Sequence, residues 1–214
     1  MNMGSGQDRR RIARVQLDNE ERWKMTKIIA ESDLRHYAVA IPYIDETNLL
    51  FEVRSEKISH QPGDVCFPGG AVEKGENPKE AVIRELTEEL LIRKDQIDLE
   101  EEECLLVNDS VIIHCFPCHI KSYEGGYSEE EVKEVFCVPV TYFKNTPAKA
   151  YEVAWNPVFP DDFPFDKIYG GRNYGWRPQR TRIRFYEYQG RVIWGMTARI
   201  IEGYVKEFGK DTGL

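Results

Sequence analysis

Three glutamates within a five-residue span are the residues of this chain whose types and spacing could do chemistry. Glu85, Glu88 and Glu89 lie in the run RELTEELL. At about 100° per residue in a helix, the three carboxylates share an arc of about 100°. Like charges three and four residues apart repel each other, and a divalent cation bound to hard oxygen ligands removes that repulsion. The spacing therefore predicts a site for Mg²⁺ or Mn²⁺.

A second interpretation of this run is an acidic face in water, with Arg84 pairing with Glu80 and Glu88 at four-residue spacing. The residues upstream favour the metal site. The run Phe67-Pro68-Gly69-Gly70, followed by Gly75, has the backbone-special residues of a shaped loop. A shaped loop leading into a helix with a metal-binding face is the arrangement expected of a catalytic unit.

The helix that must carry these glutamates has a clear start in the sequence. Asn77 is a good N-cap, Pro78 fits the first helical position, and Glu80 can close a capping box with Asn77. The helix is therefore predicted to begin at about Pro78. Its core-facing stripe consists of Val82, Ile83, Leu86 and Leu90.

The same stretch resembles the Nudix box, which reads Gly, five residues, Glu, seven residues, then Arg-Glu-apolar-any-Glu-Glu-any-Gly-apolar. The matching residues are Gly70, Glu76, Arg84, Glu85, Leu86, Glu88, Glu89 and Ile92. Leu91 departs from the pattern, because the family has glycine there. Since that glycine would lie near the end of the helix, we expect Leu91 to extend the helix or to alter its exit.

The resemblance implies an α/β (α+β) Nudix fold, a mixed β-sheet sandwiched between helices, over residues 36–209. It implies hydrolysis of the pyrophosphate bond of a nucleoside diphosphate derivative, with a metal held by Glu85, Glu88 and Glu89. Arg84 would orient a glutamate, and Glu76 would tether the loop to Arg84. Gly70 would let the backbone approach the substrate.

An additional segment before the box resembles the motif of coenzyme A pyrophosphatases, roughly Leu-Leu-Thr-any-Arg-Ser followed by Arg, Gly and Phe-Pro-Gly-Gly at fixed spacing. Phe51 and Ser59 depart from it, and Ser59 replaces an arginine suited to a phosphate. The matching residues are Leu50, Arg54, Ser55, Gly63, Phe67, Pro68, Gly69 and Gly70. Of these, the resemblance assigns substrate binding to Arg54, Gly63, Phe67, Pro68, Gly69 and Gly70.

The substrate that this resemblance implies is coenzyme A or an acyl-coenzyme A, with 3′,5′-ADP and 4′-phosphopantetheine as products. ADP-ribose, NADH and dinucleoside polyphosphates are alternatives that use the same box. A non-catalytic nucleotide-binding regulatory module is a second alternative. Glu131 lies where some Nudix relatives complete the metal shell or place a base, so it is a further catalytic candidate; a surface carboxylate at a helix start is the other interpretation.

Composition limits the partners. With 29 basic and 37 acidic residues the net charge is −8, which argues against a broad nucleic-acid surface. The small nucleotide partner is what the resemblance implies. The sequence shows no apolar run long enough for a membrane and no secretory signal, so we expect a soluble, cytoplasmic protein. Whether it forms a homodimer stays open.

The five cysteines are expected to be reduced thiols. Cys115 and Cys118 lie between two histidines, which could suggest zinc or redox chemistry. A strand over residues 111–120 would instead send the two thiols to opposite faces of a sheet, and no second Cys/His pair stands at zinc-site spacing. The strand is therefore the preferred interpretation.

The remaining elements are predicted as follows. Residues 1–35 form an N-terminal extension with a helix over 19–32, and residues 210–214 form a tail. Hairpins are expected over 36–43 with 49–54 and over 182–188 with 191–194, and a strand over 104–107. Residues 144–179 are expected to be a long loop, and Thr197 is expected to cap a final helix ending near Phe208.

Overall fold

The computed structural model describes residues 33–100, 104–108 and 110–208. The chain divides into two units, Met1–Leu34 and Arg35–Leu214, and the second unit is the one described here. The helix predicted over 19–32 and the tail over 210–214 lie outside the described residues. No helix in the described ranges is long and apolar enough to cross a membrane.

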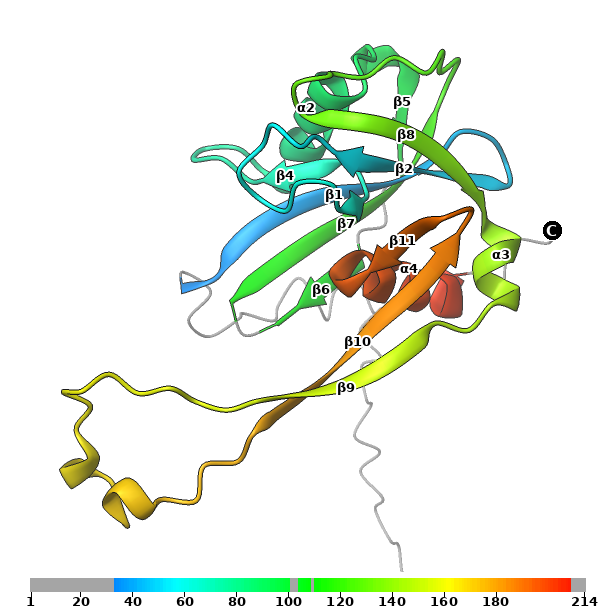
Figure 1. The fold of residues 1–214 in the computed structure, drawn as a ribbon. Helices are drawn as coiled ribbons and strands as arrows, with labels where there is room; N and C mark the ends of the chain where they lie inside the picture. Colours follow the sequence, from blue (N-terminus) through cyan, green and yellow to red (C-terminus); the bar gives the residue numbers. More distant parts are fainter. Residues whose placement is uncertain (1–32, 101–103, 109, 209–214) are drawn as a thin grey trace, which may run out of the picture. The chain divides into compact units, whose positions relative to one another are not determined.

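The larger sheet is mixed, as the resemblance implied (Figure 1). Strands β1 and β7 run parallel from end to end, whereas the other neighbours pair antiparallel. The strands are β1 (Arg35–Tyr43), β2 (Asn48–Arg54), β3 (Val65–Cys66), β4 (Gly69–Ala71), β5 (Ile97–Leu99), β6 (Cys104–Val107), β7 (Val111–Ile120) and β8 (Val132–Pro139).

The first hairpin is confirmed only at its closed end. Tyr43 of β1 pairs with Leu49 of β2, and the two strands then separate. Beyond that point β4 pairs with β1, and Gly70 of β4 lies opposite Ala38. Strand β2 instead pairs with β3 and with β8. This splitting lets the glycine-rich loop pair with β1, the strand that also pairs with β7.

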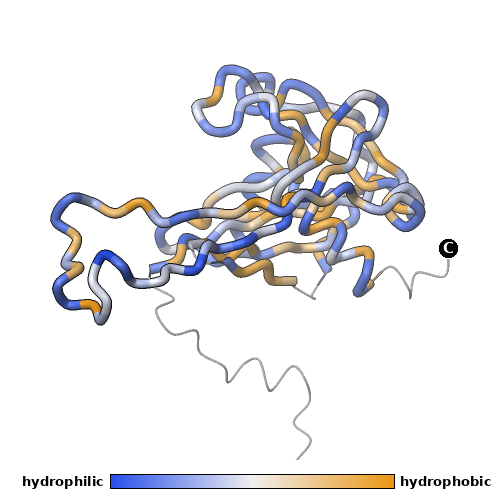
Figure 2. Tube along the Cα trace, turned by 60° about the horizontal axis from the view of Figure 1, so that its bottom comes forward, coloured by the Kyte–Doolittle hydropathy of each residue, from blue (hydrophilic) through white to orange (hydrophobic). Residues whose placement is uncertain are grey.

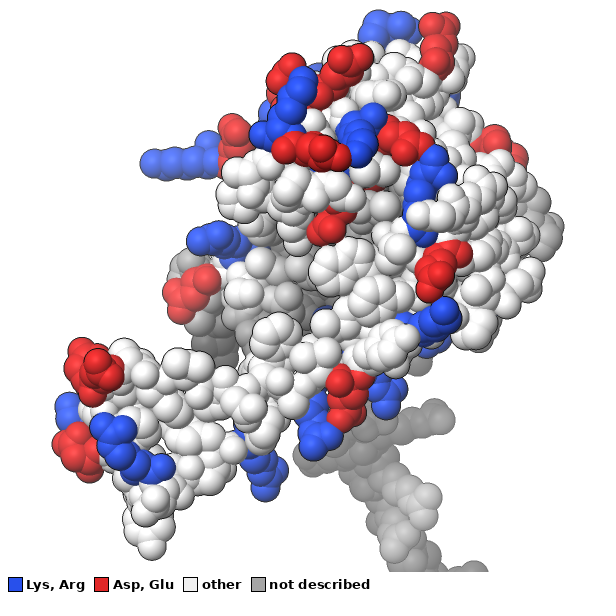
Figure 3. Space-filling model, in the orientation of Figure 1, with Lys and Arg blue, Asp and Glu red and all other residues white. Residues whose placement is uncertain are grey.

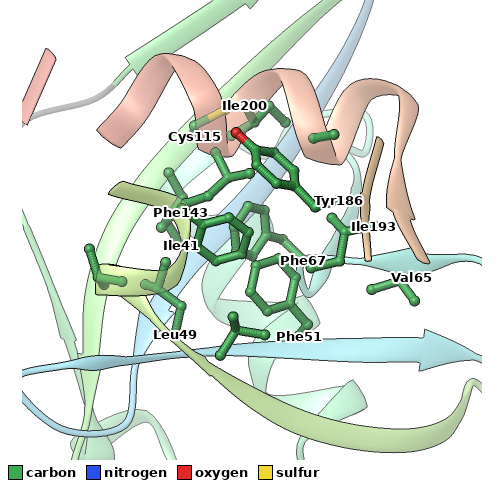
Figure 4. Packing of buried hydrophobic residues seen from close by; sticks show 14 of the residues in the cluster. Ile41, Leu49, Phe51, Val65, Phe67, Cys115, Phe143, Tyr186, Ile193 and Ile200 are labelled. Atoms are coloured by element: carbon green, nitrogen blue, oxygen red, sulfur yellow. The ribbon is translucent and has the colours of Figure 1, made fainter. Parts of the chain in front are cut away.

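Helices cover both faces of this sheet. Helix α2 (Pro78–Glu89) packs on one face, where its Val82 and Leu86 meet Ala40 and Leu50. Helices α3 (Val140–Asn145) and α4 (Gly195–Phe208) pack on the other face. Figure 4 shows side chains from β1, β2, the later strand β10 (Gln179–Tyr188) and α4 pointing into this second core. The predicted arrangement of a sheet between helices is confirmed.

The two cysteines of β7 illustrate the alternation of a buried strand. Cys115 packs in the cluster on the α4 side and Cys118 in the cluster on the α2 side. The prediction that they point to opposite faces is confirmed. Burial raises the pKa of Cys118 to about 12, so this thiol stays protonated at neutral pH.

The prediction of a loop over 144–179 is wrong in part, because it contains β9 (Lys149–Trp155). This strand pairs with β10, and β10 pairs with β11 (Arg191–Trp194), as the last predicted hairpin required. Six of the seven β9 residues are exposed, and Tyr151, Val153 and Trp155 alternate along the strand, so the sequence held a short apolar alternation that the loop prediction overlooked. Strands β9 and β10 extend from the domain as an arm, and apolar residues return at its tip (Figures 1 and 2).

The helix termini show one confirmation and one correction. Asn77 accepts from the Glu80 backbone N–H at 3.0 Å, and the Glu80 side chain accepts from the Asn77 N–H at 2.9 Å, so the capping box is formed. The capping prediction for Thr197 is wrong. Helix α4 follows β11 directly from Gly195, where φ is +63°, so Thr197 already lies in the first turn.

Candidate metal and nucleotide site

Three carboxylates from two parts of the chain meet beside α2. One oxygen each from Glu85, Glu89 and Glu131 lies within 4.8 Å of the others. Glu85 and Glu89 are one turn apart on α2, and Glu131 comes from the turn that precedes β8. Oxygen ligands gathered at this spacing suit a hard divalent cation.

Two backbone hydrogen bonds bring Glu131 to the helix. The Ser128 N–H donates to the Glu89 carbonyl at 2.8 Å, which fixes the turn to the end of α2. The Ser55 N–H donates to the Glu131 carbonyl at 2.8 Å, and Ser55 is itself buried at the end of β2. The structure thus brings this predicted residue into the acidic cluster.

Glu88 stands apart from that cluster. Its side chain is 52% exposed and accepts from Arg84 Nη1 at 3.2 Å. The same Nη1 donates to Glu85 Oε1 at 2.8 Å, so one guanidinium nitrogen links the two glutamates. The pairing of Arg84 with Glu88 from the second interpretation is present, while Glu80 serves the helix cap. The ligand role of Glu88 stays a prediction.

The expected contact between Glu76 and Arg84 is present. Arg84 Nε donates to Glu76 Oε1 at 3.0 Å and Nη2 donates to Oε2 at 3.1 Å. Arg84 Nη2 also donates to the Ala71 carbonyl at 3.2 Å. Since a bidentate pair fixes both partners in orientation, Arg84 fastens the loop to the helix and presents Nη1 to Glu85.

Two consecutive glycines let the loop and the helix carboxylates approach. A Cβ atom on Gly70 would lie 2.1 Å from Glu85 Oε1. Gly69 has φ +148°, its Cβ would lie 2.3 Å from the Ala38 carbonyl oxygen, and its N–H donates to Glu89 Oε2 at 2.8 Å. Any larger residue would displace either the carboxylates or β1.

The electrostatics of the cluster call for a cation. Burial, followed by the charges of Glu52 and Glu85, raises the pKa of Glu89 well above its usual range. Burial also raises the pKa of Glu85, although Arg84 opposes the shift. Charging the buried Glu89 and the partly buried Glu85 beside Glu131 is costly unless a positive charge joins them. These donors and their crowding therefore fit a divalent metal ion.

Sequence reasoning missed Glu52, which lies in β2 beside this cluster. Its side chain is fully buried, Oε1 accepts from Cys66 Sγ at 3.2 Å, and Oε2 has no partner. Burial raises the pKa of Glu52 to about 7, with smaller effects from Cys66, Arg54 and the neighbouring carboxylates. The available signal was a charged residue in the apolar run NLLFEVR, at the position where the quoted motif has threonine.

The predicted substrate-binding residues fall into two groups. Arg54 and Gly63 lie in the loop after β2, where Arg54 Nε donates to the His60 carbonyl at 3.2 Å and Gly63 N–H donates to the Arg54 carbonyl at 3.0 Å. Phe67 is 3% exposed and stacks on Phe51 at 4.5 Å between ring centres. The structure therefore places Phe67 in the core. Pro68, also buried, offers its carbonyl to Ala40 N–H at 2.9 Å.

Leu91 has a left-handed backbone conformation of the kind that favours glycine. Helix α2 ends at Glu89, Leu90 is its C-cap, and Leu91 has φ +50° with 63% exposure. The expected extension of the helix is wrong. A leucine in the left-handed region costs about 1–2 kcal/mol of conformational energy. The chain nevertheless turns away from the helix axis at Leu91, where the family pattern has glycine.

The box motif, the helix α2 that carries its glutamates and the mixed sheet together define the class of this protein. Residues 34–158 match the NUDIX domain model, more than half of the chain, and the chain belongs to the Nudix family.

Particular relatives are similar over parts of the chain. Mouse peroxisomal coenzyme A diphosphatase NUDT7 is 31% identical over 113 residues, which are 50% of this chain and 48% of that protein. Escherichia coli 8-oxo-dGTP diphosphatase is 40% identical over 58 residues, 27% of this chain and 45% of that protein. The chain thus spans about half the length of these two relatives.

A longer match and a solved structure complete the comparison. The uncharacterized Nudix hydrolase NudL of Photorhabdus laumondii is 28% identical over 177 residues, 78% of this chain and 81% of that protein. A Caenorhabditis elegans Ap4A hydrolase of known structure is 20% identical with a TM-score of 0.43, and the match covers 49% of this chain and 80% of that one.

Proposed function

We propose that this chain hydrolyses the pyrophosphate bond of a nucleoside diphosphate derivative, with coenzyme A or an acyl-coenzyme A as substrate. The products would be 3′,5′-ADP and 4′-phosphopantetheine. The observation that carries the proposal is the meeting of Glu85, Glu89 and Glu131 within 4.8 Å. The name of the mouse relative and the segment from Arg54 to Gly70 support coenzyme A over other substrates.

Glu85, Glu89 and Glu131 would hold Mg²⁺ or Mn²⁺, and Glu88 is retained as a fourth candidate ligand. When bound, such an ion neutralises the pyrophosphate charge and lowers the pKa of a water molecule. Arg84 holds Glu85 in place, and the Gly69 N–H holds Glu89. Both carboxylates are therefore oriented before substrate arrives, which reduces the reorganisation needed for the reaction.

A proton must leave the attacking water, and Glu131 is the residue we assign to take it. Glu131 is exposed, whereas Glu89 is buried and committed to the Gly69 N–H. An exposed carboxylate can release the proton to solvent after each turnover. Arg54, whose charge acts on both Glu52 and Glu89, would pair with a substrate phosphate at the rim of the site.

A specific observation keeps other substrates in the proposal. Ser59 Oγ lies 2.8 Å from His60 Nδ1, so the Ser59 hydroxyl is hydrogen-bonded to the next residue. A serine here also offers no guanidinium to a 3′-phosphate. ADP-ribose, NADH and dinucleoside polyphosphates, which need no such contact, are therefore the alternative substrates. A non-catalytic nucleotide-binding module is the alternative outside the enzymes.

The deciding experiment is product analysis over a substrate panel. Purified protein is incubated with coenzyme A, ADP-ribose, NADH and a dinucleoside tetraphosphate, each with Mg²⁺ or Mn²⁺, and products are separated by chromatography. We expect 3′,5′-ADP from coenzyme A in the native protein and none from Glu89→Gln. Absence of any product from the whole panel would leave the binding module as the better function.

Two expectations about the whole protein stay proposals. We place it in the cytoplasm and allow for a homodimer. Cell fractionation tests the location, and light scattering of the purified protein at several concentrations tests the oligomeric state.

A further inference from the structure

A cavity of about 500 Å³ opens where the loop before β3 meets β8 and the β10–β11 hairpin. This volume lies within the usual range of small-molecule sites, about 300–1,000 Å³. Residues from four separate segments line it, among them Asp64, Lys133, Phe185, Arg191 and Trp194. Figure 3 shows charged side chains of both signs gathered over the upper part of the domain, around β8 and α2.

One wall of the cavity is an aromatic surface held in a fixed orientation. Trp194 stacks on Phe185 with ring centres 5.8 Å apart and planes within 10°. Trp194 Nε1 donates to Asp64 Oδ1 at 3.3 Å, which prevents the indole from turning. Trp194 nonetheless keeps 38% of its surface exposed. An exposed, oriented indole can stack with a planar ring.

Arg191, one of the residues that line the cavity, has an unused hydrogen-bond donor. Arg191 packs its guanidinium over Phe136 at 4.7 Å and pairs with Glu134 through Nη2, but its buried Nε has no partner. Of the buried side-chain nitrogen and oxygen atoms in the described residues, only Glu52 Oε2 also lacks a hydrogen-bond partner. Since a buried donor without an acceptor is destabilising, a ligand atom that accepts from Arg191 Nε would relieve that cost.

The cavity is joined to the acidic cluster by short stretches of chain. Lys133 and Glu134 follow Glu131 by two and three residues, a separation of roughly 10 Å at most along a strand. The Arg54 N–H donates to the Asp64 carbonyl at 2.9 Å, so the loop carrying Arg54 also forms a wall of the cavity. Val53 and Glu134 of the cavity lie on the α4 face of β2, so a molecule with its phosphates at the cluster would reach the cavity around the end of β2.

We propose that this cavity binds the purine nucleoside end of the substrate, with the base stacked on Trp194 and accepting a hydrogen bond from Arg191 Nε. The proposal rests on the proposed function for the position of the pyrophosphate. The carboxylates of Asp64 and Glu134 supply acceptors for an amino group on the base. A pantetheine arm, which is flexible and has no planar ring, would gain nothing from the stacked pair.

Binding of 3′,5′-ADP without turnover tests this subsite. Calorimetry in EDTA is carried out on the native protein, Trp194→Leu, Trp194→Phe and Trp155→Leu. We expect Trp194→Leu to weaken binding about tenfold or more, because one base–aromatic stack is lost. Trp194→Phe should recover most of the affinity. Trp155→Leu, which changes an exposed tryptophan on β9 that does not line the cavity, should leave it unchanged.

A measurement on the native chain covers the case in which a variant does not fold. Photolabelling with 8-azido-ADP followed by peptide mapping should mark residues 185–194 or 63–65, and unlabelled 3′,5′-ADP should prevent it. Labelling confined to other peptides, or equal affinity in native and folded Trp194→Leu protein, overturns the subsite. If Trp194-dependent binding occurs but no substrate of the panel is cleaved, the subsite stands and the proposed reaction fails.

Discussion

Gly70 and Glu85 occupy adjoining space so closely that a single methyl group on Gly70 would lie 2.1 Å from Glu85 Oε1. Glu85 is also held on its other side by Arg84 Nη1 at 2.8 Å. The carboxylate therefore cannot move aside without giving up its ion pair. The loop at Gly70 is therefore packed directly against the Glu85 carboxylate, with no room for a side chain between them.

Gly70→Ala should fold and lose metal affinity. The added methyl displaces the Glu85 carboxylate from Glu89 and Glu131, so we expect at least a tenfold weaker Mn²⁺ affinity by calorimetry, equivalent to about 1.4 kcal/mol. Gly175→Ala is the matched control, because a Cβ at Gly175 meets no atom within 4 Å. Equal Mn²⁺ affinity in the two variants would contradict the placement of Glu85 in the site.

Glu89→Gln should remove nearly all hydrolysis while preserving the fold. The substitution keeps the volume and removes one ligand charge, and we expect a fall in kcat of about a hundredfold or more at saturating Mg²⁺. Glu88→Gln should also reduce kcat if Glu88 leaves Arg84 to join the metal shell. Native turnover in Glu88→Gln would restrict the ligands to Glu85, Glu89 and Glu131.

Glu52 should make the metal-free protein less stable as the pH rises from about 4.5 to 7. The pKa of Glu52 is about 7 in the folded chain and 4.5 in the reference state, so the folded state binds more protons in this window. The loss amounts to roughly 3 kcal/mol and is complete above pH 7. It is measured as the free energy of unfolding in urea with EDTA.

Glu52→Gln is the test of that assignment, because glutamine has no proton to lose. Its stability should vary less between pH 4.5 and 7, and at pH 7.5 it should exceed that of the native chain. Asp45→Asn serves as a comparison on the surface, since hydrogen bonds from Asn48 and Thr47 lower the pKa of Asp45 to about 2. An unchanged pH dependence in Glu52→Gln would show that Glu52 is not the titrating group.

Arg54→Ala should act on one phosphate of the substrate. If Arg54 pairs with the 3′-phosphate of coenzyme A, its loss removes a contact of about 1.5–3 kcal/mol, roughly a ten- to hundredfold fall in kcat/KM. Dephospho-coenzyme A, which lacks that phosphate, should not respond. Ser59→Arg should raise kcat/KM for coenzyme A relative to ADP-ribose. The same ratio in native, Arg54→Ala and Ser59→Arg protein would exclude this loop from substrate selection.

Leu91→Gly should stabilise the protein by about 0.5–1 kcal/mol. Leu91 has φ +50° and is largely exposed, so glycine removes the left-handed cost and loses little packing. Urea unfolding measures the gain. Leu91→Ala keeps the unfavourable conformation, and it should show no such gain.

Much of the helix and the loop before it could be predicted because the signals are local. The cap at Asn77 and the bidentate contact of Arg84 with Glu76 both lie within the box, whereas the left-handed turn at Leu91 was not predicted. The family pattern supplied Glu131, whose position depends on Ser55, the residue that follows β2. Patterns of this kind carry information about distant contacts that propensity does not.

What could not be predicted depends on contacts between distant segments. Strand β9 is mostly exposed and has only three alternating apolar residues, so its pairing with β10 is what defines it. Glu52 appears as an ordinary polar position of a strand until α2 and β8 cover it. Asp64 and Trp194 are 130 residues apart, and nothing in the local sequence indicates their hydrogen bond.

The hydrogen bond from Ser55 to Glu131 joins the residue after β2 to the residue before β8, two segments that are far apart in the sequence. Because the third carboxylate arrives only when β8 has paired with β2, the isolated loop and α2 would hold just two of the three clustered oxygens. Affinity for the cation should consequently be a property of the completed sheet. By linkage, added Mg²⁺ would then raise the melting temperature, and a peptide spanning residues 67–92 would bind the ion far more weakly than the whole chain.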